Sequence, residues 1–202
     1  DGVLVPKDQL DQPEQIKALI YWGHSCNSQT RLPEMKKAFE KLDLLVNIDP
    51  IPGLASVMHD RTDNVYLLPA STAWESYGSV TCSNRNIQWR DKVSDPIFDS
   101  KPDHVIMYKF AKKFGFDKEL FKHIKVNGEE PLVEDITREF NRGMWTIGYT
   151  GQSPERMRAH MANQHTFDKT TLLARGGPVD GEFYGLPWPC WGTPELGHPG
   201  TP

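Results

Sequence analysis

Apolar and polar positions in the first third of the chain predict a β–α–β unit. Two short apolar runs, at residues 18–22 and 44–48, flank a segment with helical periodicity. Gly23 follows the first run, and Asp49 and Pro50 follow the second. Continuous apolar runs of this length are typical of parallel strands covered on both faces. We therefore expect two parallel strands joined by a right-handed crossover helix.

The segment between the two runs has the pattern of an amphipathic helix. Pro33 and Glu34 are favourable in a first helical turn, and Met35, Phe39 and Leu42 form one apolar stripe. This stripe predicts a helix that packs on the sheet.

Further elements follow along the chain. A third strand is expected at residues 64–68, after a short helix that includes Met58. The pattern then predicts a hairpin with strands at 79–82 and 87–89, a helix at 104–114 and a helix from Leu132 that ends near Gly143. A helix opened by Ser153 and an irregular segment from Leu172 onward follow.

Together these elements predict an α/β fold. We expect a Rossmann-like, three-layer domain with a mostly parallel sheet over residues 1–125, and a helical and irregular extension over residues 126–202. The end of the chain is rich in Pro and Gly and carries Phe183, Tyr184, Trp188 and Trp191. This composition is too aromatic for a solvated linker, so we expect the segment to lie on a surface of a longer protein.

Composition argues against several classes of protein. The 202 residues include 23 basic and 27 acidic side chains, for a net charge of −4, and no basic run is interleaved with aromatics. A nucleic-acid partner is therefore not expected. No run of 18 apolar residues occurs, so direct membrane insertion is not expected. The chain begins without Met and ends in a Pro/Gly-rich run, which suggests a piece of something longer.

Metal and nucleophilic sites are not predicted either. Cys26, Cys82 and Cys190 are widely spaced and form no CxxC pair, so neither a disulfide framework nor a zinc or iron–sulfur site follows. The seven histidines are scattered, and His160 and His165 lie five residues apart, off the spacing of a helical metal pair. We therefore assign no catalytic residue and no metal ligand.

Candidate ligand contacts gather where the first two strands end. Gly23 lets the backbone approach a ligand, and the following turn carries Asn27 and Ser28. Asp49 can accept two hydrogen bonds from a ribose diol or from the edge of guanine. Two readings stay open, since the turn also suits a helix cap without a ligand, and Asp49 also suits a simple turn. A GxGxxG fingerprint is absent.

Two later positions are further candidates. Ser76 lies in the WESYG stretch, which follows a strand and a polar turn. Asp103 most economically caps the helix after it, although such a residue beside a nucleotide can also read a base edge. Glu75 alone does not make a catalytic acid.

Three longer runs carry a resemblance to a known family. They are YWGHSCNSQTRLPEMKKAFEKLDLLVNIDP, LLPASTAWESYGSVTCSNRNIQWR and GEFYGLPWPCWGTPELGHPGTP. Together they resemble the large subunit of respiratory, membrane-complex formate dehydrogenases, in the molybdopterin oxidoreductase superfamily typified by dimethyl sulfoxide reductase. The resemblance covers nearly the whole chain but only about a fifth of such a subunit.

The resemblance implies a role in holding a cofactor. In this family the region resembles the domain that binds one guanine dinucleotide arm of a bis-molybdopterin guanine dinucleotide carrying Mo or W. The positions that match the family's contacts are Asn27, Ser28, Ile48, Asp49, Ser76 and Asp103. Ser76 stands where some related nitrate reductases have Lys. The family's cluster cysteines, its selenocysteine or cysteine ligand and its catalytic His and Arg have no counterpart here.

The resemblance also implies a setting. The parent enzyme oxidises formate to CO2, passes electrons to an iron–sulfur chain and holds a 4Fe-4S cluster that this segment does not ligate. Its expected partners are the rest of the large subunit, an iron–sulfur subunit and a membrane cytochrome subunit, in a complex that faces the periplasm. The cofactor then performs the redox chemistry and this segment orients it, so the isolated segment should be inactive.

Two other functions remain compatible with the residues. One is a stand-alone nucleotide-binding α/β oxidoreductase, which the missing glycine fingerprint disfavours. The other is a non-catalytic interaction segment whose aromatic tail docks on a partner.

Overall fold

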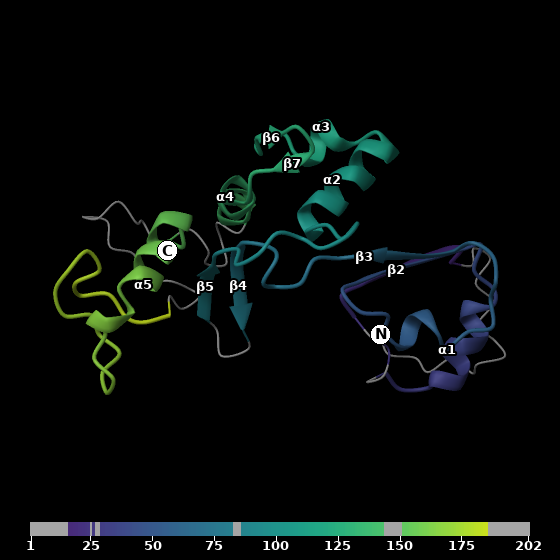
Figure 1. Cartoon of the computed structure of the whole chain (residues 1–202), viewed down its shortest axis with the longest axis horizontal. Helices are drawn as coiled ribbons and strands as arrows, with labels where there is room; N and C mark the ends of the chain where they lie inside the picture. The colour runs from purple at the N-terminus through teal and green to yellow at the C-terminus, as the bar shows by residue number, and fades with distance from the viewer. Residues whose placement is uncertain (1–15, 25, 27–28, 83–85, 144–150, 186–202) are drawn as a thin grey trace, which may run out of the picture. The chain divides into compact units, whose positions relative to one another are not determined.

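The computed structural model describes residues 16–24, 26, 29–82, 86–143 and 151–185. The chain forms two compact units, residues 1–70 and 71–202 (Figure 1). The domain boundary predicted between residues 125 and 126 stays a prediction.

The first unit is built on a parallel sheet. Its three strands lie in the order β1-β2-β3, and Tyr21 pairs with Asn47, which pairs in turn with Leu67. The elements are β1 (Ala18–Trp22), α1 (Leu32–Phe39), β2 (Leu44–Asp49), the 3-10 helix η3 (Leu54–Ser56) and β3 (Val65–Pro69). The predicted α/β fold with a parallel sheet is confirmed.

One face of this sheet carries the core of the first unit. Leu45 of β2 is completely buried against Phe39 of α1, and the same cluster includes Leu19 of β1 and Ala55 of η3. Helix α1 ends at Phe39, so Leu42 follows the helix, yet it stays buried in this cluster. The apolar stripe therefore packs on the sheet as predicted, although the helix is shorter than predicted.

The strands differ in how well they are covered. The four central residues of β2 are buried, whereas Ile20 of β1 is 42% exposed and Tyr66 of β3 is 54% exposed. The prediction of two covered faces is therefore right for β2 and wrong for β1. The exposure of Ile20 follows from the place of β1 at an edge of the three-stranded sheet and from the alternation of side chains between the two faces of a strand. Leu19 faces the cluster with α1, so Ile20 faces away from it.

The second unit begins with the predicted hairpin and continues with short helices. Strands β4 and β5 pair antiparallel, as do the short strands β6 and β7. The elements are β4 (Gly78–Cys82), β5 (Asn86–Arg90), α2 (Asp103–Phe114), α3 (Asp117–Leu120), β6 (Val126–Asn127), β7 (Glu130–Pro131), α4 (Val133–Gly143), α5 (Pro154–Ala162) and η4 (Gln164–Thr166).

The hairpin packs against helices α4 and α5. Ile87 and Trp89 of β5 form a buried cluster with Val133 of α4 and Met157 of α5. The Arg158 guanidinium lies 4.3 Å from the centre of the Trp89 ring, within cation–π range. The hairpin therefore has one face covered by helices, which gives an antiparallel pair the support that it lacks alone.

The predicted helix ends agree with the structure in most cases. Gly115 follows α2 in the left-handed conformation, with φ of 82°, and the hydroxyl of Ser153 accepts a hydrogen bond from the Arg156 N–H at the start of α5. Asp103 is an exception. Pro102 occupies the N-cap position and its carbonyl accepts from Val105 N, so Asp103 lies in the first turn of α2 rather than at the cap.

A buried charged cluster fixes the irregular segment after α5. Glu182 accepts a hydrogen bond of 2.9 Å from Arg156 Nε and also contacts His160 Nε2. All three side chains are at least 94% buried. The contact links residues separated by more than 20 positions, so it attaches the chain beyond η4 to helix α5.

The Glu182 cluster predicts acid-sensitive stability. Burial raises the pKa of Glu182, but the hydrogen bonds from His160 and Arg156 outweigh it and hold that pKa below its ordinary value of 4.5. A carboxyl whose pKa is lower in the folded state stabilises the fold above its unfolded pKa and loses that contribution as the pH falls through the folded pKa. We expect the difference in melting temperature between the wild type and Glu182→Gln to be largest above pH 4.5 and to narrow below it. Thermal unfolding followed by circular dichroism from pH 7 to pH 3 measures this, and an equal difference at both ends would contradict it.

Candidate functional site

The carboxyl edge of the parallel sheet brings three of the predicted contacts together in the first unit. The chain turns at Gly23, whose N–H donates a 2.8 Å hydrogen bond to the Ile48 carbonyl. Gly23 has φ of 59°, and a Cβ added there would meet no atom within 4 Å, so its backbone borders open space. Ile48 is 1% exposed, so it contributes its backbone to this edge and its side chain to the packing.

Asp49 ends β2 on the same edge, and one of its two carboxylate oxygens accepts a hydrogen bond. Its Oδ1 accepts from the Ile51 N–H at 3.3 Å, which is the turn role that the sequence left open. Its Oδ2 has no hydrogen-bond partner among the residues that the structure describes. Because a carboxylate accepts through both oxygens, Asp49 can shape the turn and still contact a ligand.

Cys26 anchors the turn between Gly23 and α1; its neighbours at 25, 27 and 28 lie outside the described residues. Cys26 is completely buried, and its thiol lies 2.9 Å from the Met58 sulfur. Burial raises the pKa of this thiol, so it is a packed apolar group and no nucleophile. Asn27 and Ser28, both predicted contacts, lie outside the described residues.

Asn47 is a polar residue of this site that the sequence analysis did not select. It is 6% exposed on the central strand, two positions before Asp49 and therefore on the same face. Neither the oxygen nor the nitrogen of its side-chain amide has a partner within the described part of the chain. A buried amide without partners costs free energy. The signal in the sequence is a single polar residue inside an apolar strand.

The second unit holds a cleft of about 560 Å³, a volume within the usual range of small-molecule sites. Ser76 lines it, and its hydroxyl donates a 3.2 Å hydrogen bond to the Thr72 carbonyl. The start of α2 contributes its N-cap residue Pro102 and Val105 of the first turn. Asp103 is the first residue of the helix and is not among the residues that line the cleft.

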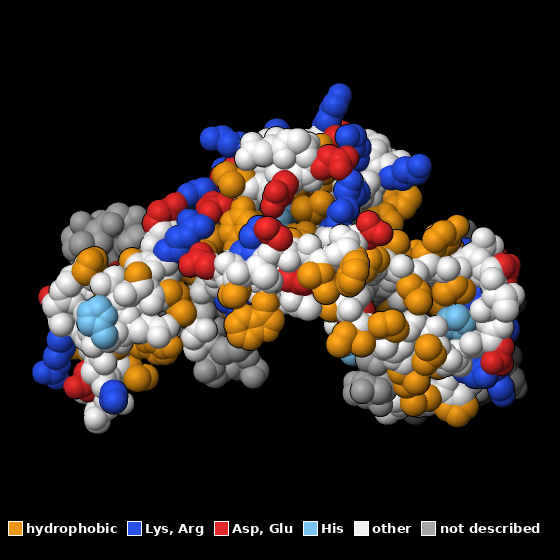
Figure 2. All heavy atoms as spheres, viewed as in Figure 1, with side chains coloured by type: hydrophobic (Ala, Val, Ile, Leu, Met, Phe, Trp, Pro, Cys, Tyr) orange, Lys and Arg blue, Asp and Glu red, His pale blue; other side chains and the backbone are white. Residues whose placement is uncertain are grey.

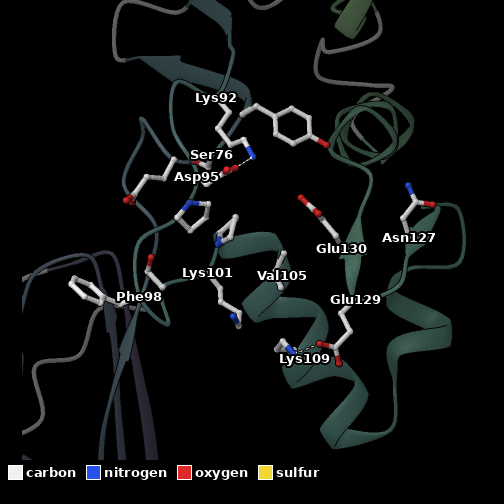
Figure 3. Close-up of a pocket in the computed structure, with 15 residues that line it drawn as sticks. Ser76, Lys92, Asp95, Phe98, Lys101, Val105, Lys109, Asn127, Glu129 and Glu130 are labelled. Atoms are coloured by element: carbon white, nitrogen blue, oxygen red, sulfur yellow. Dashed lines mark hydrogen bonds and ion pairs between the residues drawn. The ribbon is translucent and has the colours of Figure 1, made fainter.

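Charged groups of both signs line this cleft (Figure 3). Lys92 pairs with Asp95 at 2.6 Å at one end, and Lys109 pairs with Glu129 at the other. The pairing with Asp95 raises the pKa of Lys92, and the pairing with Lys109 lowers the pKa of Glu129, so both of these groups are charged near neutral pH. The balance of signs does not favour a strongly anionic ligand over a polar one.

Glu75 lines the same cleft but has a structural task. Its carboxylate accepts from the Thr72 N–H at 2.8 Å, from the Thr72 hydroxyl at 3.0 Å and from the Ile97 N–H at 3.3 Å. The backbone hydrogen bond from Thr72 lowers the pKa of Glu75, so the group stays ionised and tied to its own loop.

The structure therefore places the predicted contacts in both units. Gly23, Ile48 and Asp49 share one sheet edge, while Ser76 and Asp103 belong to the second unit. Within the described residues, no group of His, Cys, Asp and Glu side chains could hold a metal ion, and no helix has the length and apolarity to cross a membrane.

Comparison with known proteins finds relatives that are named as oxidoreductases. The chain is 30% identical to a trimethylamine-N-oxide reductase of Pasteurella multocida over 161 residues, which are 73% of this chain and 18% of that protein. It is 31% identical to a putative formate dehydrogenase of Staphylococcus aureus strain MRSA252 over 144 residues, or 71% and 13% of the two chains. The protein of the same name from strain USA300 is 36% identical over 143 residues, or 66% and 14%.

The chain spans less than a fifth of the length of these curated relatives. No family model matches it.

Proposed function

Because this chain is similar to part of several oxidoreductases, we propose that it is a cofactor-binding segment of a molybdopterin oxidoreductase. Within that family we propose a formate dehydrogenase, in agreement with two of the relatives by name. Its task is to hold the guanine dinucleotide arm of a bis-molybdopterin guanine dinucleotide that carries Mo or W.

The observation that carries this proposal is the free oxygen of Asp49 at the edge of a parallel sheet. Ligands of open α/β sheets bind beyond the carboxyl ends of the strands. Guanine presents N–H donors at N1 and N2, and a carboxylate oxygen without a protein partner can accept from them. Gly23 beside it leaves room for the approach of a ligand. The residues present therefore fit the nucleoside end of such a cofactor.

This chain's residues would bind and orient the cofactor rather than react with the substrate. When bound, the metal-bearing pterin supplies the redox chemistry of formate oxidation. Asp49 would hold the base, and Gly23 with the Ile48 backbone would shape the turn that borders it. By resemblance, Asn27 and Ser28 would contact the same dinucleotide, and so would Ser76 and Asp103 of the second unit.

The parent protein and its setting form part of the proposal. The rest of a large subunit would supply the metal ligand, a 4Fe-4S cluster and the catalytic groups, and iron–sulfur and cytochrome subunits would take the electrons at the periplasmic side of a membrane. Exposed apolar side chains support a larger protein around this segment, for example Ile51, 73% exposed, and Phe98, 97% exposed. Hydrophobic side chains are visible on the viewed surface of both units (Figure 2).

Removing the Asp49 carboxylate should weaken guanine nucleotide binding. For Asp49→Ala we expect a loss of about 1.5–3 kcal/mol, the usual value of a charged hydrogen bond, or roughly a 10- to 150-fold higher Kd for GMP. Isothermal titration calorimetry of the 202-residue chain measures it. Asp43→Ala is the matched control, because Asp43 lies at the opposite end of β2 in an exposed pair with Lys17. Equal Kd values for wild type and Asp49→Ala would remove the basis of the proposal.

A further inference from the structure

An imidazole ring lies fixed at the sheet edge that holds Asp49. The ring of His24 is nearly parallel to that of Tyr21, with 6.1 Å between the ring centroids and 7° between the planes. This geometry is that of an offset aromatic stack. A hydrogen bond also holds the ring at its edge, since Gln29 Nε2 lies 2.9 Å from His24 Nε2.

The same ring remains accessible. His24 is exposed, whereas Tyr21, on which it stacks, is half-buried on β1, next to the core residue Phe39. Burial raises the pKa of Tyr21, so the phenol stays neutral and its ring is a stable support. An exposed ring held in one orientation has already lost the freedom that binding would otherwise cost it.

Its place on the chain puts this ring beside the proposed ligand. Gly23 reaches the edge of the sheet through its hydrogen bond to the Ile48 carbonyl, and His24 is the next residue. Asp49 follows Ile48 on the neighbouring strand. A carboxylate that can accept from a base edge and a flat ring that can contact a base face thus lie at adjacent strand ends.

Resting on the proposed function, we propose that His24 is the base-stacking residue of the nucleotide site. The guanine ring lies against the imidazole while Asp49 accepts hydrogen bonds from the guanine edge. Stacking needs only a flat ring on each side, so it adds affinity for any base, and the carboxylate selects guanine.

A role in the loop alone is the competing explanation, and two variants separate the roles. His24→Ala removes the ring, whereas His24→Phe keeps a flat ring and loses the nitrogen that faces Gln29. Stacking predicts that alanine raises the Kd for GMP by about 5- to 150-fold and that phenylalanine stays within about 3-fold of the wild type. His165→Ala, which removes an exposed histidine of the second unit, is the matched control and should bind as the wild type does.

Calorimetry with GMP on the full 202-residue chain, alongside melting temperatures, decides the matter. The stacking role would be overturned if His24→Ala bound GMP with the Kd of the wild type. It would also be overturned if His24→Ala and His24→Phe raised the Kd equally, because a phenyl ring should stack. If Asp49→Ala also weakens GMP binding in that case, the proposed function survives and only the role of His24 fails. Absence of GMP binding by the wild type would overturn both.

Discussion

Glu182→Gln should lower the free energy of unfolding of the second unit by about 3–5 kcal/mol, the usual result of removing one partner from a buried ion pair. The substitution keeps the shape of the side chain but removes the carboxylate charge that pairs with the Arg156 guanidinium, which is 6% exposed. His160 loses the same partner in an equally buried position. The 2.9 Å hydrogen bond from Arg156 to the neutral Gly151 carbonyl does not depend on the Glu182 charge.

Urea unfolding at neutral pH is the measurement, and helix α5 offers a matched control. Glu155 lies on the same helix and pairs with Arg138, but its side chain is 62% exposed. Glu155→Gln should therefore change the free energy of unfolding by about 0–1 kcal/mol. A Glu182→Gln protein as stable as the Glu155→Gln protein would show that the cluster is not a determinant of stability.

Gly78→Ala should destabilise the second unit by about 2–4 kcal/mol through the sum of two costs, backbone strain and overpacking. Gly78 begins β4 with φ of 140°, a conformation that side-chain-bearing residues rarely adopt. A Cβ there would also lie 2.6 Å from Val133 Cγ1, inside the contact distance of two carbons. Val133 has little room to move, because it is β-branched and buried in the cluster with Trp89.

Gly115→Ala separates the two costs. Gly115 has φ of 82°, but a Cβ there meets no atom within 4 Å, so the substitution adds strain without a clash. We expect a loss of about 1 kcal/mol for this variant. Melting temperatures and urea midpoints of both variants give the comparison. An equal loss of stability in Gly78→Ala and Gly115→Ala would mean that Val133 moves away from the added Cβ without an energetic penalty.

Neither substitution changes a residue of the compact unit that contains Asp49, since Glu182 and Gly78 belong to the other unit. Each is therefore a test of the fold of the second unit that leaves Gly23, His24 and Asp49 of the first unit unchanged. If Asp49→Ala or His24→Ala weakens GMP binding without lowering stability, the weaker binding comes from the lost contact and not from unfolding of the first unit.

Much of the first unit follows from local patterns in the sequence. The apolar runs at 18–22 and 44–48 predict strands because each is short and ends at a residue that breaks strands. The periodic segment between them predicts the crossover helix, and a crossover of this length makes the strands parallel. Asp49 can then be placed at the carboxyl edge of the sheet without any coordinates.

Other features depend on contacts between distant parts of the chain. Asn47 looks like an ordinary strand residue until the structure shows its buried amide without a partner. Asp103 has the residue type of a helix cap, yet Pro102 takes that position because its fixed extended backbone starts the helix. His24 was one of seven scattered histidines, and only the ring of Tyr21 and the amide of Gln29 distinguish it.

The sequence by itself determined the order of the longer strands and helices, the parallel α/β character of the first unit and the edge at which Gly23 and Asp49 meet, but not the short elements α3, β6, β7 and η4. These features depend on hydrophobic periodicity and on the residues that start or end an element. Both signals involve only neighbouring positions in the sequence. The tertiary structure alone decided that Arg156, His160 and Glu182 share one buried cluster, that Gly78 faces Val133 and that Ser76 lines a cleft. The physical reason is distance along the chain, because packing joins residues whose pairing no local pattern encodes.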